Sequence, residues 1–147
     1  MLTKPRRVES NHESTMLHQL RHLHAQILAL LAELERLTLE PAPPRGLAAL
    51  RFRLTSVSRS RTRLLEGRLY AHAAMGASAA QMRALQALRA DGKEQLAQSG
   101  SHLAKWDMRT IEARWADYCA ASRAMRAQMR KRVRAEQELL YPLLEDR

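Results

Sequence analysis

Hydrophobic residues recur at three- and four-residue spacing along four stretches of this chain, which is the period of an amphipathic helix. The first predicted helix covers about 10–39 and the second about 47–74. The third covers about 79–104, and the last begins after Asp107, a suitable N-cap, and continues to about Leu144. The positions expected to face inward are Leu17, Leu20, Ile27, Leu28, Leu31, Leu50, Leu54, Val57, Leu64, Leu65, Met82, Leu85, Leu88, Leu96, Leu103, Ile111, Trp115, Tyr118, Met125, Met129, Leu139, Leu140 and Leu143.

Breaking and capping residues separate these stretches. The segment PAPPRG at 41–46 interrupts the first helical pattern, because proline cannot continue a helix. Ser10 with Glu13, and Ser78 with Gln81, have the spacing of a capping box, which marks the start of a helix. Short connections between amphipathic helices favour neighbours that run in opposite directions. The pattern therefore predicts an all-α fold, a single up-down-up-down four-helix bundle.

Composition agrees with this fold class. The chain has 147 residues, enough for one domain with one core, and it has five Gly and five Pro. Good helix formers dominate it. Residues 1–9 are polar and basic, and we expect a flexible N-terminal arm there. Residues 10–147 are then the bundle domain.

Two ionisable residues interrupt the apolar stripe of the last helix. Arg132 and Glu136 are four residues apart and lie on the stripe, within RKRVRAEQELLYPLL at 130–144. A charged pair on a buried helix face is costly unless other groups answer it. His24 interrupts the first stripe and Arg61 the second. These four residues are the candidate site.

Several segments are similar to those of hemerythrin-like proteins. RVRAEQELLYPLLE resembles the fourth helix of that family, and HAQILALLAEL, starting at His24, resembles the first. RTRLLEGRLYAH at 61–72 resembles the second helix, and LAKWDMRTIEARWADY resembles a Trp-bearing connection. The resemblance spans roughly 13–145 and implies a bundle that holds a di-iron centre between its helices.

The positions that correspond to the iron ligands are mostly changed. His24 keeps the first-helix histidine, and Glu136 keeps the fourth-helix glutamate. Arg61 and Leu65 stand where the second helix should carry a histidine and a glutamate, and Arg132 replaces the fourth-helix histidine. Guanidinium is always charged and has no lone pair for a metal. The resemblance thus implies a lost metal site and no cofactor, with iron held by a rearranged ligand set as the alternative.

We expect the arginines to take the place of the cation. Arg61 and Arg132, together with Glu136 and His24, would form a buried polar network through charge-assisted hydrogen bonds. Two guanidinium groups beside one carboxylate leave an excess positive charge. Another acid or a bound anion must balance this charge, or water must solvate it. The alternative is that one arginine extends to the rim and a single pair forms.

The formal net charge of +10 raises the question of an anionic partner. Arg123, Arg126, Arg130 and Arg134 share one face of the last helix, a possible basic binding face for an acidic protein or a phosphate backbone. Few aromatic residues accompany it, which disfavours base stacking. A solvated face explains the same pattern, and the partner and oligomeric state stay open.

Other chemistry is sparse. Cys119 has no evident base beside it, and His18 with His22 lies away from the leucine stripe. The sequence lacks a phosphate loop, a Ser/His/Asp set and a CxxC pair, so we expect no enzyme. No signal peptide, membrane span or disulfide is expected, which favours the cytoplasm. The prediction is a non-catalytic, metal-free binding or regulatory module, with an iron-dependent O2 or redox sensor and a nucleic-acid-associated protein as alternatives.

Overall fold

The structure is a computed structural model that describes residues 4–145, with side chains described from Thr15 onward. Helices form nearly all of this part of the chain and it contains no strand, so the prediction of an all-α fold is confirmed. The elements in chain order are α1 (Lys4–Leu37), α2 (Leu47–Leu64), the π-helical turn η1 (Leu65–Leu69), α3 (Tyr70–Ala74), α4 (Ala79–Lys105), α5 (Met108–Ala113) and α6 (Trp115–Glu145). None of the described helices is long and apolar enough to cross a lipid bilayer.

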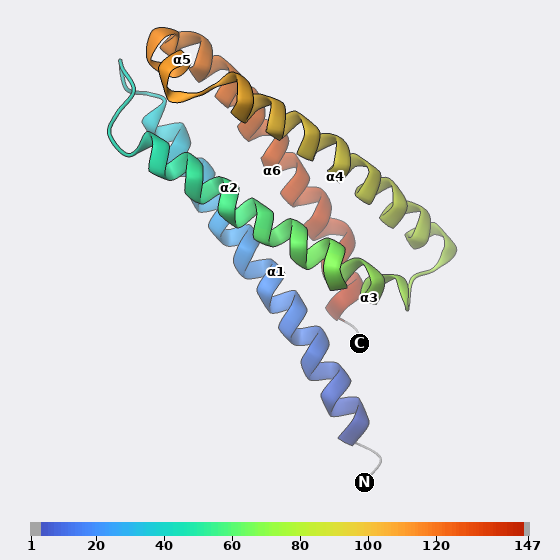
Figure 1. The fold of residues 1–147 in the computed structure, drawn as a ribbon. Helices are drawn as coiled ribbons and strands as arrows, with labels where there is room; N and C mark the ends of the chain where they lie inside the picture. The colour runs from blue at the N-terminus through green and yellow to red at the C-terminus, as the bar shows by residue number, and fades with distance from the viewer. Residues whose placement is uncertain (1–3, 146–147) are drawn as a thin grey trace.

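The long helices α1, α2, α4 and α6 lie lengthwise beside one another (Figure 1). α1 packs against α2 and α6, whereas α4 packs against α6 and α3. α6 contacts α1, α3, α4 and α5, so its inward face meets side chains from most of the molecule. A polar residue on that face therefore has partners from several helices within reach.

The first helix begins earlier than the sequence predicts. α1 starts at Lys4, so the expected arm overlaps the helix, and the expected cap at Ser10 falls inside it. Residues 1–3 of that arm lie outside the described residues, as do the side chains of the predicted capping box. Lys4 to Leu37 form one uninterrupted helix, which places His24 well inside it.

The second segment follows the predicted span of 47–74, with one change of pitch. Gly46 has φ +92°, a left-handed conformation that glycine adopts without strain, and it precedes α2. The chain then passes from α2 through η1 into α3 without leaving helical geometry. A π turn inserts an extra residue into the helix, so the side chains on either side of it are rotated relative to a regular α-helix.

Capping explains where the later helices begin. Ser78 accepts a hydrogen bond from the backbone N–H of Gln81, whose side chain accepts from the backbone of Ser78, as predicted. Asp107 also caps a helix as predicted, but that helix is the short α5. The chain leaves helical geometry at Arg114 before α6 begins. The prediction of one continuous last helix from Asp107 is therefore wrong.

The core consists of two apolar clusters with a polar layer between them. Toward one end of the molecule, the fully buried members include Ile27, Leu31, Leu34, Leu47 and Ile111. Toward the other end, they include Leu20, Leu69 and Leu140. His24 lies on α1 between Leu20 and Ile27, and Arg132 and Glu136 are buried on α6 between the clusters. The charges that interrupt the stripes in the sequence thus form a layer across the core.

Three predicted inward positions are instead exposed. Leu28 is 37% exposed, because Ile27 takes the buried place beside it on α1. Leu96 is 55% exposed and Leu103 is 38% exposed, although both continue the stripe of α4. The second half of α4 therefore has an apolar face that no neighbouring helix fully covers.

Candidate functional site

Four polar side chains from three helices meet in the layer between the two apolar clusters. His24 comes from α1, Arg61 from α2, and Arg132 and Glu136 from α6. His24, Arg132 and Glu136 are each at least 96% buried, and the side chain of Arg61 is 13% exposed. The structure therefore brings together all four residues singled out from the sequence.

Arg132 is the most extensively bonded member. Its Nε donates to Oε2 of Glu136 at 2.6 Å, and its Nη1 donates to the backbone carbonyl of Leu88 on α4 at 2.6 Å. Its Nη2 donates to the hydroxyl of Tyr70 on α3 at 2.9 Å. Two nitrogens of this guanidinium thus join α6 to α4 and α3, and the third bonds to Glu136 on α6 itself. Hydrogen bonds that involve a charged group are stronger than neutral ones, at about 1.5–3 kcal/mol each.

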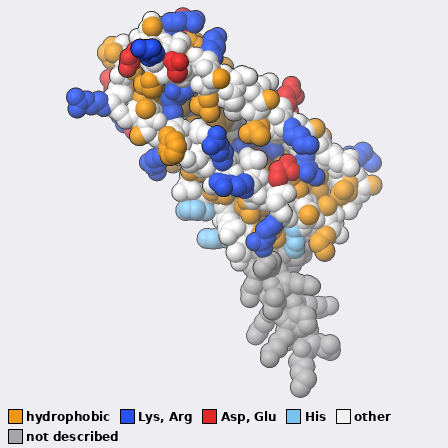
Figure 2. Space-filling view, viewed as in Figure 1, with side chains coloured by type: hydrophobic (Ala, Val, Ile, Leu, Met, Phe, Trp, Pro, Cys, Tyr) orange, Lys and Arg blue, Asp and Glu red, His pale blue; other side chains and the backbone are white. Residues whose placement is uncertain are grey.

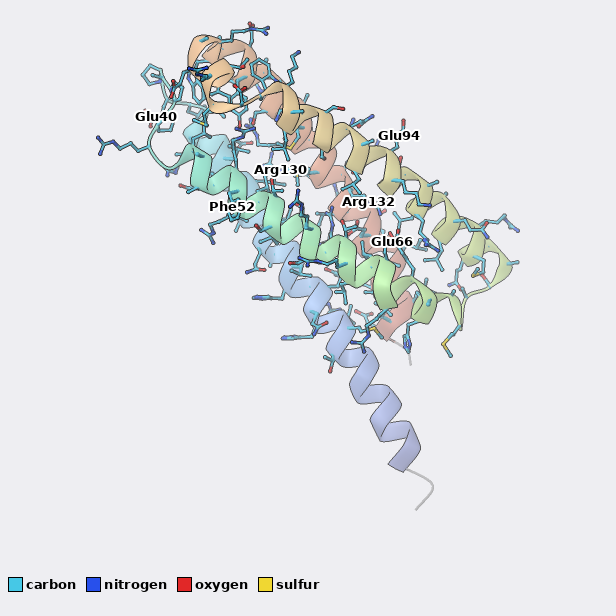
Figure 3. The ribbon with its side chains drawn as sticks, in the orientation of Figure 1. Glu40, Phe52, Glu66, Glu94, Arg130 and Arg132 are labelled. Carbon is cyan, nitrogen blue, oxygen red and sulfur yellow. The ribbon has the colours of Figure 1, made fainter. Side chains whose placement is uncertain are left out.

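Gly92 makes room for this guanidinium. A Cβ atom placed on Gly92 would lie 2.7 Å from Nη2 and 3.2 Å from Cζ of Arg132. The same guanidinium also bonds to the carbonyl of Leu88, one turn earlier on α4. Arg132 therefore lies flat against one turn of α4, and the missing side chain at Gly92 permits this approach. Figure 3 shows Arg132 on α6 in the space between α2 and α4.

Glu136 is the acid at the centre of the layer. Burial by itself raises the pKa of this carboxyl. The hydrogen bond from His24 and the charges of Arg61 and Arg132 oppose that effect and leave the pKa of Glu136 below its usual value. Glu136 is therefore ionised at neutral pH. The fixed charge of Arg132 offsets the free-energy cost of burying this carboxylate.

His24 connects the layer to α1. Its Nε2 lies 2.7 Å from Oε1 of Glu136, and because an ionised carboxylate can only accept, Nε2 is the donor. Its Nδ1 lies 2.7 Å from the hydroxyl of Tyr141 on α6. Both oxygens of Glu136 are consequently engaged, one by His24 and the other by Arg132. The imidazole is held between two partners and does not face open space with a free ring nitrogen.

Arg61 stands apart from these bonds. Its Nε lies 3.9 Å from Oε1 of Glu136, which is an ion pair but too long for a hydrogen bond. Within the part of the chain that the structure describes, the buried Nε and Nη1 atoms of Arg61 have no hydrogen-bond partner. The structure therefore matches neither expectation fully: His24, Glu136 and Arg132 form a hydrogen-bonded network, whereas Arg61 is buried beside it without a hydrogen bond to it. The second guanidinium stays close but without an acceptor.

Leu65, four residues after Arg61, stands where the resemblance predicts a second-helix glutamate. It is buried in an apolar cluster, and it is the first residue of the π turn η1. An alkyl side chain offers no lone pair, so α2 contributes no carboxylate to the layer.

A cavity of about 370 Å³ borders the polar layer. α2 and α4 form its sides and α6 its floor, with Arg61, Arg132 and Glu136 among the lining residues. Leu54, Leu65, Met125 and Met129 give it an apolar wall, and the exposed Leu96 and Leu103 lie at its edge. Its volume is within the range of small-molecule sites.

The four arginines of the predicted basic face of α6 do not form one continuous exposed surface. Arg123 and Arg134 are exposed, and Arg130 forms an ion pair with Glu35 of α1 at 3.0 Å. Arg126 is 96% buried, and its Nη1 donates to Ser122 at 2.8 Å and to Thr38 at 3.2 Å. The prediction is therefore wrong for Arg126, because α1 covers that side of α6. Figure 2 shows Lys and Arg side chains spread over the visible face, with hydrophobic side chains exposed between them.

Cys119, His18 and His22 are the remaining residues that the sequence analysis considered. The thiol of Cys119 donates to the backbone carbonyl of Thr38 at 3.6 Å, and burial raises its pKa, which disfavours the reactive thiolate. His18 and His22 are exposed on α1. Among the described residues, no three His, Cys, Asp or Glu side chains converge as a metal site would require.

The residues at the positions that resemble iron ligands in the sequence do not fit a di-iron centre. Such a centre needs several imidazoles and carboxylates that converge from facing helices. Here Glu136 and His24 are bonded to each other, and Arg132 occupies the space beside them. Two guanidinium groups would repel metal cations at this point.

Searches against models of protein families, curated proteins and solved structures each find no match to this chain. The resemblance to hemerythrin-like proteins therefore stays a prediction from the sequence.

Sequence reasoning missed the partners that hold the arginine in place. Tyr70, Tyr141 and the carbonyl of Leu88 accept or share hydrogen bonds with the layer, and none was singled out. Gly92, inside the predicted third helix, permits the close approach of a guanidinium from α6. A glycine within a predicted helix is the signal that the sequence offered for such an approach.

Proposed function

We propose that this chain is a metal-free, non-catalytic binding module, built as a four-helix bundle of hemerythrin-like type. The observation that carries the proposal is the bonded set of Arg132, Glu136 and His24 at the positions that resemble iron ligands. In this proposal, the guanidinium supplies the positive charge that metals supply in ligand-complete relatives. It links the helices through hydrogen bonds in place of coordination bonds.

The geometry supports binding over catalysis. Both oxygens of Glu136 are engaged, and neither is poised to take a proton from a substrate. The layer nevertheless borders an open cavity, which a purely structural core would fill with side chains. We therefore propose that the polar layer maintains the shape of a ligand site, and that occupancy of this site is the regulatory signal.

Iron loading tests the proposal against the alternative of an iron-dependent sensor. The purified protein is incubated anaerobically with ferrous iron, desalted, exposed to air and analysed for metal content and near-ultraviolet absorption. We expect no more retained iron than in the matched variant His24→Ala, and no oxo-bridge absorption. Stoichiometric iron that is lost in His24→Ala would overturn the metal-free proposal.

A further inference from the structure

The cavity between α2 and α4 has an excess of positive charge. Its lining carries two glutamates, Glu66 and Glu136. Glu136 is fully engaged by His24 and Arg132, and Glu66 forms an ion pair with Arg89 at 2.8 Å. The cationic lining residues outnumber these acids, and they are Arg51, Arg59, Arg61, Lys93 and Arg132. An anion that entered the cavity would meet a favourable potential.

Arg61 is a cation of this lining with buried donor atoms that a ligand could engage. Each of the three guanidinium nitrogens of Arg132 already has an acceptor, and Arg51 donates to the backbone carbonyl of Trp106 at 2.6 Å. The buried Nε and Nη1 atoms of Arg61 have no acceptor among the described residues, and the same is true of Oγ of Ser58. Ser58 and Arg61 are three residues apart on α2, so both lie on the side that lines the cavity. Together they offer donors for one anionic group.

The rest of the lining indicates what the anion is attached to. Leu54, Leu65, Met125 and Met129 form an apolar wall, and Leu96 and Leu103 leave apolar surface at the edge. An inorganic anion would contact the donors but leave this wall uncovered. A ligand with one anionic end and an apolar body would satisfy both the guanidinium and the wall.

We propose that this cavity binds a small amphiphilic carboxylate, such as a medium-chain alkanoate, with its carboxylate on Arg61 and Ser58 and its alkyl chain against the apolar wall. The proposal rests on the proposed function, because it identifies the ligand class of the binding module. The carboxylate supplies the acceptor that Arg61 lacks, and it balances the excess charge beside Glu136. Arg132 stays with Glu136 and shapes the cavity without holding the ligand.

Calorimetric titration with octanoate, octanol and inorganic phosphate tests this assignment in the full chain. We expect octanoate to bind more tightly than either of the other two, since octanol lacks the charge and phosphate lacks the alkyl chain. Arg61→Met should weaken octanoate binding by at least about tenfold, the effect of losing a charged hydrogen bond. The matched control is Arg63→Met, because Arg63 is exposed on the same helix and does not line the cavity.

Ser99→Phe gives a second variant that leaves the charges intact. Ser99 is half-buried on α4 and lines the cavity, so a phenyl group there should occupy the space of the alkyl chain and abolish octanoate binding. Equal binding of octanol and octanoate, or octanoate binding that survives both Arg61→Met and Ser99→Phe, would overturn the assignment, as would no octanoate binding to the parent protein. Iron loading of the same preparation tests the metal-free proposal separately, so the two failures are distinguishable.

Discussion

Replacement of Gly92 by alanine should destabilise this protein, although alanine is the better helix former. Gly92 lies inside α4, where the change from glycine to alanine ordinarily stabilises a helix by up to about 1 kcal/mol. Here the new Cβ would lie 2.7 Å from Nη2 of Arg132. The tip of an arginine usually moves away at little cost, but this one is held by Glu136, Tyr70 and the carbonyl of Leu88.

The size of the effect follows from those bonds. If the guanidinium moves enough to relieve the contact, at least one charged hydrogen bond is lost, at about 1.5–3 kcal/mol. Subtracting a gain in helix propensity of about 1 kcal/mol leaves a net loss of about 0.5–2 kcal/mol for Gly92→Ala. For a chain of this length, that loss corresponds to a melting temperature lower by several degrees.

Gly100 provides the matched control. It lies on the same helix, and a Cβ there would meet no atom within 4 Å. Gly100→Ala should therefore stabilise the protein by up to about 1 kcal/mol. Urea denaturation followed by circular dichroism measures the free energy of unfolding of both variants. If Gly92→Ala proves as stabilising as Gly100→Ala, then Arg132 does not lie against α4 as described.

Two further predictions concern Glu136. Glu136→Ala should lower the free energy of unfolding by about 3–5 kcal/mol in urea melts, because it leaves the buried charge of Arg132 without its partner; the exposed Glu138→Ala on the same helix should change it by less than about 0.5 kcal/mol. Because the pKa of Glu136 is lowered on folding, the unfolded chain binds this proton more readily, and stability should decline as the pH falls below about 4.3. Urea melts of Glu136→Gln across the same pH range should show a shallower acid decline, and an unchanged slope would exclude an ionised Glu136 in the folded state.

The sequence predicted the helices well because their signals are local. The stripe of leucines, the proline-rich break before Gly46 and the Ser78 cap each act within a few residues, and the structure shows each of them. The break at Arg114 carries no proline or glycine, and the early start of α1 at Lys4 has no cap in the predicted place. The spacing of hydrophobic residues alone reveals neither boundary.

The sequence predicted which residues meet at the candidate site, but it did not predict which hydrogen bonds they form. Polar residues on an apolar stripe singled out His24, Arg61, Arg132 and Glu136, because a buried charge is stable only when it is paired or hydrogen-bonded. Which arginine hydrogen-bonds to the carboxylate depends on how each helix is rotated about its axis. The π turn that follows α2 begins four residues after Arg61, and the sequence does not reveal such a change in helical pitch. Arg126 was misassigned because the spacing along α6 does not reveal that Thr38, just after α1, lies against this side chain.

A double-mutant cycle between Arg132 and Glu136 tests the central claim most directly. The free energy of unfolding is measured by urea denaturation for the parent protein, Arg132→Met, Glu136→Gln and the double variant, with sucrose present to favour the folded state of the weaker variants. A buried, hydrogen-bonded pair predicts a coupling energy of at least about 2 kcal/mol, and the double variant should be more stable than the sum of the single losses implies. Single losses that add to within about 0.5 kcal/mol would contradict the claim that Arg132 and Glu136 form a coupled, buried pair.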